Sequence, residues 1–237
     1  YLILNLPCNL RSLDMASMAL KKKLLWKSRL YIIADKQALG KRKLTALKKI
    51  KKLPIILQYR DKVSDKDSIL KGAKDFLLAF GRDNFLFIVN DYPDIAKIIN
   101  ADGVHLGQSD ASVSAARKIL GKNKIIGVSC HSLKQALAAQ SQGADYVGIG
   151  PIFPTLTKPG VKAVGPGLIR KCVGKLRIPF FAIGGINRDN LGLILGSLGK
   201  RIALTRAICD SKDIARSIRY FACRLKKIND SDRSSKK

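Results

Sequence analysis

Short apolar segments recur along the chain, and most of them end on polar or small residues. Eight such segments are present: RLYIIAD (29–35), IILQYR (55–60), LFIVND (86–91), GVHLG (103–107), KIIGVS (124–129), DYVGIG (145–150), PFFAIGG (179–185) and RIALTR (201–206). Many are apolar throughout rather than alternating, which is typical of parallel strands covered on both faces. Helical patterns separate them, so the chain predicts repeated strand–helix units.

The intervening helices have their own start and stop signals. The run Ser64-Asp65-Lys66-Asp67 resembles a capping box and precedes an apolar helical face. Ser132 with Gln135 predicts another helix start, and Gly143 marks the end of that helix. The last helix carries an apolar stripe of Ile214, Ala215, Ile218, Phe221, Ala222 and Leu225.

Eight strand–helix units in 237 residues predict the α/β class and a single (β/α)8 TIM barrel, for which about 250 residues is typical. We expect an N-terminal extension over residues 1–28, partly disordered, then the barrel over 29–228, and a disordered polar tail over 229–237. A doubly wound open sheet is the alternative architecture. The chain opens on Tyr rather than Met, and Met15 and Met18 are candidate natural starts.

Composition narrows the class of partner. With 46% hydrophobic residues the chain can bury a sizeable core, and its formal charge of +28 favours nucleic acid, a membrane surface or phosphorylated metabolites. Five scattered cysteines without a CxxC pair suggest neither a disulfide framework nor a zinc site. No run reaches the roughly 18 apolar residues of a membrane span, and the opening lacks the basic region of a secretory signal. A cytoplasmic protein that does not insert into membranes is expected.

Polar side chains collect where the predicted strands end, and in a barrel these ends converge on the active-site face. Asp91 and Asp110 follow the third and fourth strands, so both can face one ion, and oxygen ligands of this kind suit Mg²⁺. Arg60, Lys62 and Lys158 add positive charge, and Asn90 adds a neutral donor. Together they predict a diphosphate site. A salt-bridged loop for QYRDK and a helix-capping role for Asp110 are the alternatives.

A second anion site is predicted after the seventh strand. In AIGGINRDN, adjacent glycines allow backbone N–H groups to approach a phosphate, and barrels often bind phosphate near the last two strands. The PTLTKPG loop adds the Thr155 and Thr157 hydroxyls. A tight turn that uses glycine for its geometry is the alternative.

Neither histidine belongs to a recognisable nucleophile motif. His105, inside GVHLG, is expected to be an interior or packing residue, and His131 is expected at the rim. Cys130 beside His131 is a poor nucleophile candidate, because adjacent strand residues point to opposite sides.

The ordered motifs QYRDK, VNDYPDIA, ADGVHLGQSD, IIGVSCHS, GADYVGIGPIFPTLTK and IPFFAIGGI resemble the thiamine phosphate synthase family from about Leu30 to Ile208. The resemblance implies a (β/α)8 transferase of thiamine biosynthesis. Such an enzyme joins a hydroxymethylpyrimidine diphosphate to a thiazole phosphate and releases diphosphate with Mg²⁺. Small phosphorylated substrates, rather than specific nucleic acid, are the partners that it implies, and an oligomer is compatible with it.

The same resemblance assigns roles to matching positions. It places the pyrimidine diphosphate on Gln58, Arg60, Lys62, Asn90, Ser129 and Lys158, with Arg60, Lys62 and Lys158 as the catalytic cations. It places the metal on Asp91 and Asp110. It places the thiazole phosphate on Thr155, Leu156, Thr157, Gly185, Thr205 and Arg206.

One segment departs from the family pattern. RIALTRAI carries Arg201 and Arg206 where the family usually has Gly and Ser, which changes the expected thiazole phosphate site. Three alternatives remain: a thiazole tautomerase-like barrel with His131 as proton carrier, an inactive binder of thiamine precursors, and a basic nucleic-acid-binding protein. The last draws on the basic runs at 21–23, 41–43 and 48–52, which no aromatic stacking pattern accompanies.

Overall fold

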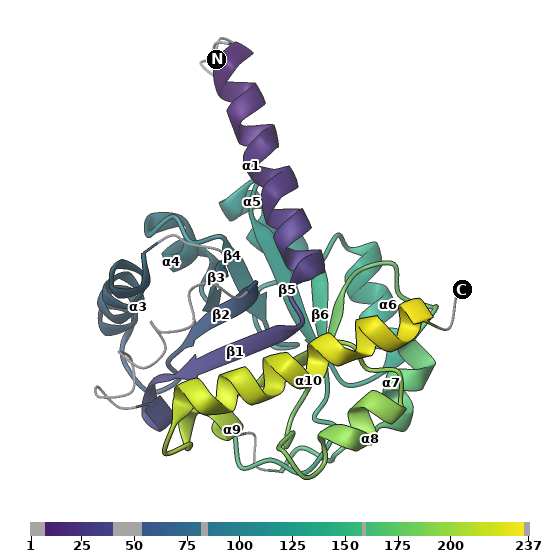
Figure 1. Cartoon of the computed structure of the whole chain (residues 1–237). Helices are drawn as coiled ribbons and strands as arrows, with labels where there is room; N and C mark the ends of the chain where they lie inside the picture. Colours follow the sequence, from purple (N-terminus) through teal and green to yellow (C-terminus); the bar gives the residue numbers. More distant parts are fainter. Residues whose placement is uncertain (1–7, 40–53, 82–84, 158–159, 235–237) are drawn as a thin grey trace.

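The strands close into one parallel barrel. A computed structural model describes residues 8–39, 54–81, 85–157 and 160–234. In it the sheet is a closed barrel with the order β1-β2-β3-β4-β5-β6-β7-β8 (Figure 1). The strands are β1 (Leu30–Asp35), β2 (Ile55–Arg60), β3 (Phe85–Asn90), β4 (Gly103–Leu106), β5 (Ile125–Cys130), β6 (Tyr146–Ile149), β7 (Phe180–Ile183) and β8 (Ile202–Leu204).

Each strand overlaps one of the eight predicted segments, which confirms the barrel over the open sheet. Leu30 pairs with Ile55 on one side and with Ile202 on the other, so β8 closes on β1. This closure removes both sheet edges and brings every strand's carboxyl end to one rim.

Helices cover the outside of the barrel. They are α3 (Lys66–Phe80), α4 (Pro93–Ile98), α5 (Val113–Leu120), α6 (Leu133–Ser141), α7 (Gly167–Cys172), α8 (Leu191–Gly196), α9 (Arg206–Cys209) and α10 (Ile214–Ser234), with α1 (Cys8–Lys27) ahead of β1. Two predicted helix starts are present as side-chain caps. Asp65 accepts a hydrogen bond from the Ser68 N–H at 2.9 Å, and Ser132 accepts one from the Gln135 N–H at 3.2 Å.

The barrel has two apolar layers. The outer layer lies between strands and helices, where buried residues such as Ile32, Leu57 and Phe87 meet the faces of α3 to α10. The inner layer fills the barrel and contains Tyr31, Ile56, Leu86, Ile88, Ile125, Tyr146 and Phe181. Alternate residues of each strand supply the two layers, because side chains alternate across a strand.

Both terminal helices differ from the sequence prediction. Within the predicted extension, α1 ends against the barrel, and Leu25, 1% exposed, packs into the inner layer, while the rest of the helix extends away (Figure 1). A disordered tail was predicted from residue 229, whereas α10 continues to Ser234. No Gly or Pro interrupts that segment, so nothing local ends the helix earlier. Residues 1–7 and 235–237 lie outside the described part. Within the described ranges, no helix combines the length and apolarity that a bilayer crossing requires.

Candidate functional site

A cavity of about 290 Å³ opens at the carboxyl ends of the strands. Ten of the predicted site residues line it: Gln58, Arg60, Asn90, Ser129, Thr155, Leu156, Thr157, Gly185, Thr205 and Arg206. The other three described ones, Lys62, Asp91 and Asp110, form a contact group next to Asn90. Lys158 lies outside the described residues. The fold therefore brings together side chains from distant parts of the chain.

Arg60, one of the two arginines that line the cavity, is held by a buried acid. Asp35, 4% exposed, and Arg60 end the neighbouring strands β1 and β2 in register. The Arg60 Nη1 donates to the Asp35 Oδ2. The other Asp35 oxygen accepts the N–H groups of Gln37 at 3.2 Å and Ala38 at 3.3 Å. This contact fixes the guanidinium at the cavity wall, where its remaining N–H groups can serve an anionic ligand.

Two carboxylates and a lysine meet beside the cavity. The Asp91 and Asp110 side chains are hydrogen-bonded to each other, and Lys62 forms an ion pair with Asp91. Burial raises the pKa of Asp91 to about 6, Asp110 adds to the increase, and Lys62 opposes it. Asp110 also accepts the Gly107 N–H at 2.6 Å. Asp91 itself has φ of 66°, a conformation that Asp tolerates better than most residues.

The two acids predicted to face one ion interact with each other in the fold. Among the described residues no group of three or more His, Cys, Asp or Glu side chains is arranged to hold a metal ion. Two carboxylates are nevertheless sufficient protein ligands for Mg²⁺, which usually keeps water and phosphate oxygens.

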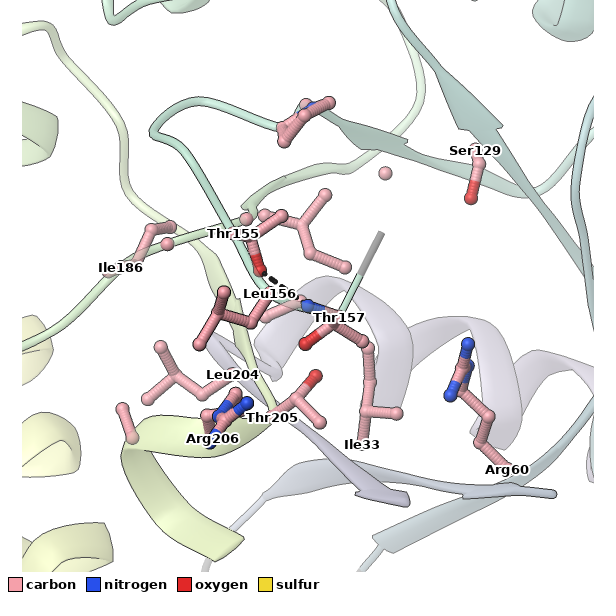
Figure 2. Close-up of a pocket in the computed structure, with 18 of the residues that line it drawn as sticks. Ile33, Arg60, Ser129, Thr155, Leu156, Thr157, Ile186, Leu204, Thr205 and Arg206 are labelled. Atoms are coloured by element: carbon pink, nitrogen blue, oxygen red, sulfur yellow. Dashed lines mark hydrogen bonds between the residues drawn. The ribbon is translucent and has the colours of Figure 1, made fainter. Parts of the chain in front are cut away.

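The opposite wall is built from a glycine turn and a threonine loop. Gly185 has φ of 65°, and a Cβ on it would lie 2.4 Å from the Pro154 carbonyl oxygen, so only glycine lets these segments meet. The Thr157 N–H donates to the Thr155 hydroxyl at 3.3 Å (Figure 2). The Asn190 Nδ2 donates to the Gly185 carbonyl oxygen at 2.8 Å, which stiffens the turn.

Arg206 lies on the same wall, at the start of α9. It lines the cavity and donates through Nε to Asp210 at 2.7 Å, with half of its side chain exposed. Figure 2 shows it beside Thr205 and Leu204, across the cavity from Arg60 and Ser129. Arg206, which departs from the family pattern, therefore lies at the cavity itself.

His105 adds to the predicted set of cavity residues, and the predicted Asn90 presents a buried donor. His105 is interior, as predicted, but it also lines the cavity and its Nε2 lies 2.9 Å from the Ser129 hydroxyl. The Asn90 Nδ2 is buried and has no hydrogen-bond partner in the described part of the chain, so it is available to a ligand. A polar residue inside an otherwise apolar strand, as in GVHLG, was the signal for His105.

The remaining titratable candidates are less suited to chemistry. Burial raises the pKa of the Cys130 thiol to about 12, so this thiol is not an activated nucleophile. His131 lies at the cavity, with its Nδ1 against the Gly150 carbonyl oxygen. Of the basic runs, 41–43 and 48–52 lie outside the described residues, and Lys21 in the first run donates to the Asn123 carbonyl oxygen at 3.3 Å.

The fold and the cavity define a (β/α)8 barrel with cationic and hydroxyl side chains on two facing walls of the cavity. Comparison with known proteins gives the family. The family profile described as "Thiamine monophosphate synthase" matches residues 30–208. The chain belongs to this family.

Individual relatives agree with that assignment. The thiamine-phosphate synthase of Methanospirillum hungatei is 44% identical over 168 residues, which cover 70% of this chain and 82% of the relative. That of Prochlorococcus marinus is 41% identical over 183 residues, 77% of this chain but only 53% of the relative, so the chain spans about half of that protein. Among solved structures, thiamine phosphate pyrophosphorylase from Pyrococcus furiosus superimposes with a TM-score of 0.74 at 31% identity, covering 86% of this chain and 98% of that one.

Proposed function

We propose that this chain is a Mg²⁺-dependent thiamine phosphate synthase. It joins 4-amino-2-methyl-5-hydroxymethylpyrimidine diphosphate to 4-methyl-5-(2-phosphoethyl)thiazole and releases diphosphate. The observation that carries the proposal is the pairing of Asp91 with Asp110 and Lys62, next to a cavity that Arg60 lines on one side and a glycine turn lines on the other. The family assignment supports the same reaction.

The two walls suit two different anionic substrates. Arg60 and Ser129 lie on one side of the cavity, and Thr155, Leu156, Thr205 and Arg206 lie on the other (Figure 2). We assign the pyrimidine diphosphate to the first side, with Gln58, Lys62 and Asn90, and the thiazole phosphate to the second, with Thr157 and Gly185. Lys158, which lies outside the described residues, is assigned to the diphosphate from the family resemblance alone. The space between the walls is then where the reacting carbon and nitrogen meet.

Asp91 and Asp110 would hold the metal. Burial is the main cause of the raised pKa of Asp91, and the neighbouring Asp110 adds to it, because two acids close together repel each other when both are ionised. A divalent cation held by the two side chains would offset that repulsion. When bound, Mg²⁺ supplies positive charge to the oxygens of the leaving diphosphate.

The chain's own residues stabilise a departing anion and keep the two substrates aligned. The bond between the pyrimidine methylene carbon and the diphosphate oxygen breaks, and the electron pair leaves with the diphosphate. Arg60, Lys62 and Lys158 disperse that charge, and the Asn90 and Ser129 donors bind oxygens of the same group. The lone pair of the thiazole nitrogen then forms the new C–N bond, so no protein nucleophile and no net proton transfer are needed.

A cytoplasmic location is part of the proposal, supported by five scattered cysteines without a CxxC pair, which suggest no disulfide framework. The test of the reaction is incubation of the purified chain with both precursors, with and without Mg²⁺, followed by detection of thiamine phosphate. Product that requires both precursors and the metal supports the synthase. Conversion of the thiazole phosphate alone would favour the tautomerase alternative, and binding without product would favour an inactive binder.

A further inference from the structure

Beneath the cavity, five side chains from five strands form an unbroken series of hydrogen bonds across the barrel interior. The Gln58 Nε2 lies 2.9 Å from the Tyr31 hydroxyl, which lies 2.8 Å from the Tyr146 hydroxyl. The Tyr146 hydroxyl lies 3.0 Å from the His105 Nδ1, and the His105 Nε2 lies 2.9 Å from the Ser129 hydroxyl. We call Tyr31, Tyr146 and His105 the relay.

The relay links residues of the cavity through two tyrosines that do not line it. Gln58, His105 and Ser129 line the cavity, whereas the two tyrosines are among the fully buried side chains below it. Their rings pack edge to face on Phe181, with centroids 5.4 and 5.8 Å away. The relay is therefore closed to bulk water on its lower side.

The barrel makes room for this arrangement. Gly127 on β5 pairs with Tyr146 on β6, and a Cβ at position 127 would lie 2.0 Å from the Tyr146 Cζ. A side chain there would displace the tyrosine ring. The glycine is thus required for the central hydroxyl of the relay to occupy its place.

The orientation of the Gln58 amide, with Nε2 toward Tyr31, sets one direction for the protons. Burial raises the pKa values of Tyr31 and Tyr146 well above their usual range, so each phenol keeps its single proton. The Gln58 Nε2 can only donate, so the Tyr31 oxygen accepts from it and donates its own proton to Tyr146. Tyr146 then donates to the His105 Nδ1, which must be unprotonated. The His105 proton is therefore on Nε2 and is donated to the Ser129 oxygen.

We propose that the relay is a positioning device that makes Ser129 an obligate hydrogen-bond donor to the substrate and fixes the orientation of the Gln58 amide. Because the Ser129 oxygen already accepts from His105, its own O–H is left to point into the cavity, where an anionic oxygen would receive it. Because the Gln58 Nε2 donates one hydrogen to Tyr31, the orientation of the amide is fixed, and its Oε1 can accept an N–H of the ligand. This inference rests on the proposed function for the identity of the ligand, but not for the direction of the relay.

The relay also couples the hydrogen-bonding roles of Gln58 and Ser129, the two residues that it connects. If Gln58 presented its oxygen to Tyr31, every proton of the series would reverse, and Ser129 would donate to His105 instead of to the ligand. A ligand that carries an N–H donor at Gln58 and an anionic oxygen at Ser129 satisfies only the first direction. An aminopyrimidine bearing a diphosphate has both groups.

The direction of the relay can be measured without any substrate. The chain has two histidines, so the protein labelled with ¹⁵N-histidine should show two imidazoles, and His131→Gln assigns them. At about pH 8, where an ordinary histidine is neutral, we expect the His105 proton on Nε2 and a shifted Nδ1 resonance in Tyr146→Phe, which lacks the donor. A proton on Nδ1 in the unsubstituted protein, or an Nδ1 resonance unchanged in Tyr146→Phe, overturns the proposal.

Coupling to the ligand is tested with inorganic diphosphate and Mg²⁺ by calorimetry. We expect Tyr31→Phe and Tyr146→Phe each to weaken binding by about 3- to 10-fold, the effect of one lost hydrogen bond. Ser129→Ala should weaken it by a similar factor, and the double variant Ser129→Ala/Tyr146→Phe should be no weaker than Ser129→Ala alone. If the losses of diphosphate affinity from Ser129→Ala and Tyr146→Phe multiply in the double variant, Tyr146 does not act through Ser129 and the proposal is overturned.

A matched control removes a buried hydroxyl outside the relay. Tyr59, 5% exposed on β2, packs its ring against Phe76 in the outer layer, with centroids 5.7 Å apart. Tyr59→Phe should leave both the His105 resonances and diphosphate binding unchanged, and a loss equal to that of Tyr146→Phe would contradict the proposal. If the relay passes these tests and the chain makes no thiamine phosphate, the proposed reaction fails and the relay stands.

Discussion

Replacing Asp35 by Asn tests whether the buried carboxylate holds Arg60 in place. Asn can keep the two backbone hydrogen bonds from Gln37 and Ala38, because both use the Oδ1 position. What it loses is the negative charge that meets the Arg60 guanidinium, and the Asn N–H group would face another donor. The substitution therefore removes the ion pair and little else.

The expected cost follows from burial. Removing one partner of a buried pair costs about 3–5 kcal/mol, because the other charge stays uncompensated. The side chains of Asp35 and Arg60 are 6% and 14% exposed, so the guanidinium keeps some contact with water. We therefore expect Asp35→Asn to lower the free energy of unfolding by about 2–4 kcal/mol. The KM for the pyrimidine diphosphate should rise as well, since Arg60 loses its orientation.

Urea denaturation of the purified variant measures this cost. The double variant Asp35→Asn/Arg60→Gln should recover part of the lost stability, because it removes the unpaired charge. The matched control is Asp210→Asn, which breaks the Arg206 pair, about half exposed on both sides, and should cost about 0.5 kcal/mol or less. Equal stability of Asp35→Asn and the unsubstituted chain, or a double variant less stable than the single one, would refute the reasoning.

Three further substitutions test other parts of the site. Asp91→Asn keeps a residue that tolerates the positive φ of 66° but removes a carboxylate, so Mg²⁺-dependent turnover should fall at least about 100-fold with an unchanged melting temperature; retained turnover would contradict the metal assignment. Gly185→Ala should raise the KM for the thiazole phosphate and lower stability by more than about 1 kcal/mol, because its Cβ would meet the Pro154 carbonyl oxygen; kinetics and melting like those of the unsubstituted protein would contradict that packing. Burial of Asp61 would raise its pKa, but the hydrogen bonds from Lys36 and Ser64 outweigh burial and hold the pKa well below its usual value. An acid with a lowered pKa in the folded state stabilises it above the unfolded pKa of about 4, so Asp61→Asn should be less stable at pH 7 and the difference should shrink as pH falls below about 4. A difference that is constant between pH 7 and pH 3 would contradict this account.

Much of the fold could be read from local patterns. The apolar runs predicted all eight strands, because a strand buried on both faces needs apolar side chains on both sides whatever its neighbours are. The helix starts at Ser132 and within the run 64–67 were predicted because a capping side chain acts on backbone groups within three residues. The ends of α1 and α10 were not predicted, because no capping or helix-breaking residue marks them.

The candidate site was predictable as a set of residues but not as an arrangement. Polar side chains at strand ends had to converge once the barrel closed, and Gln58, Arg60, Asn90 and Ser129 do line one cavity. Which of these side chains would contact one another could not be predicted from the sequence. The contact of Asp35 with Arg60 depends on the register of β1 and β2, which the order of strands does not reveal.

The sequence by itself determined the number, order and parallel direction of the strands, because these follow from the pattern of apolar residues along the chain. Only the tertiary structure decided the interior contacts. Tyr31 and Tyr146 are 115 positions apart, and in sequence each is one more aromatic residue in an apolar strand. Their hydroxyls meet because the closed barrel turns both side chains inward at the same height, and that depends on strand stagger and closure, which no local pattern encodes.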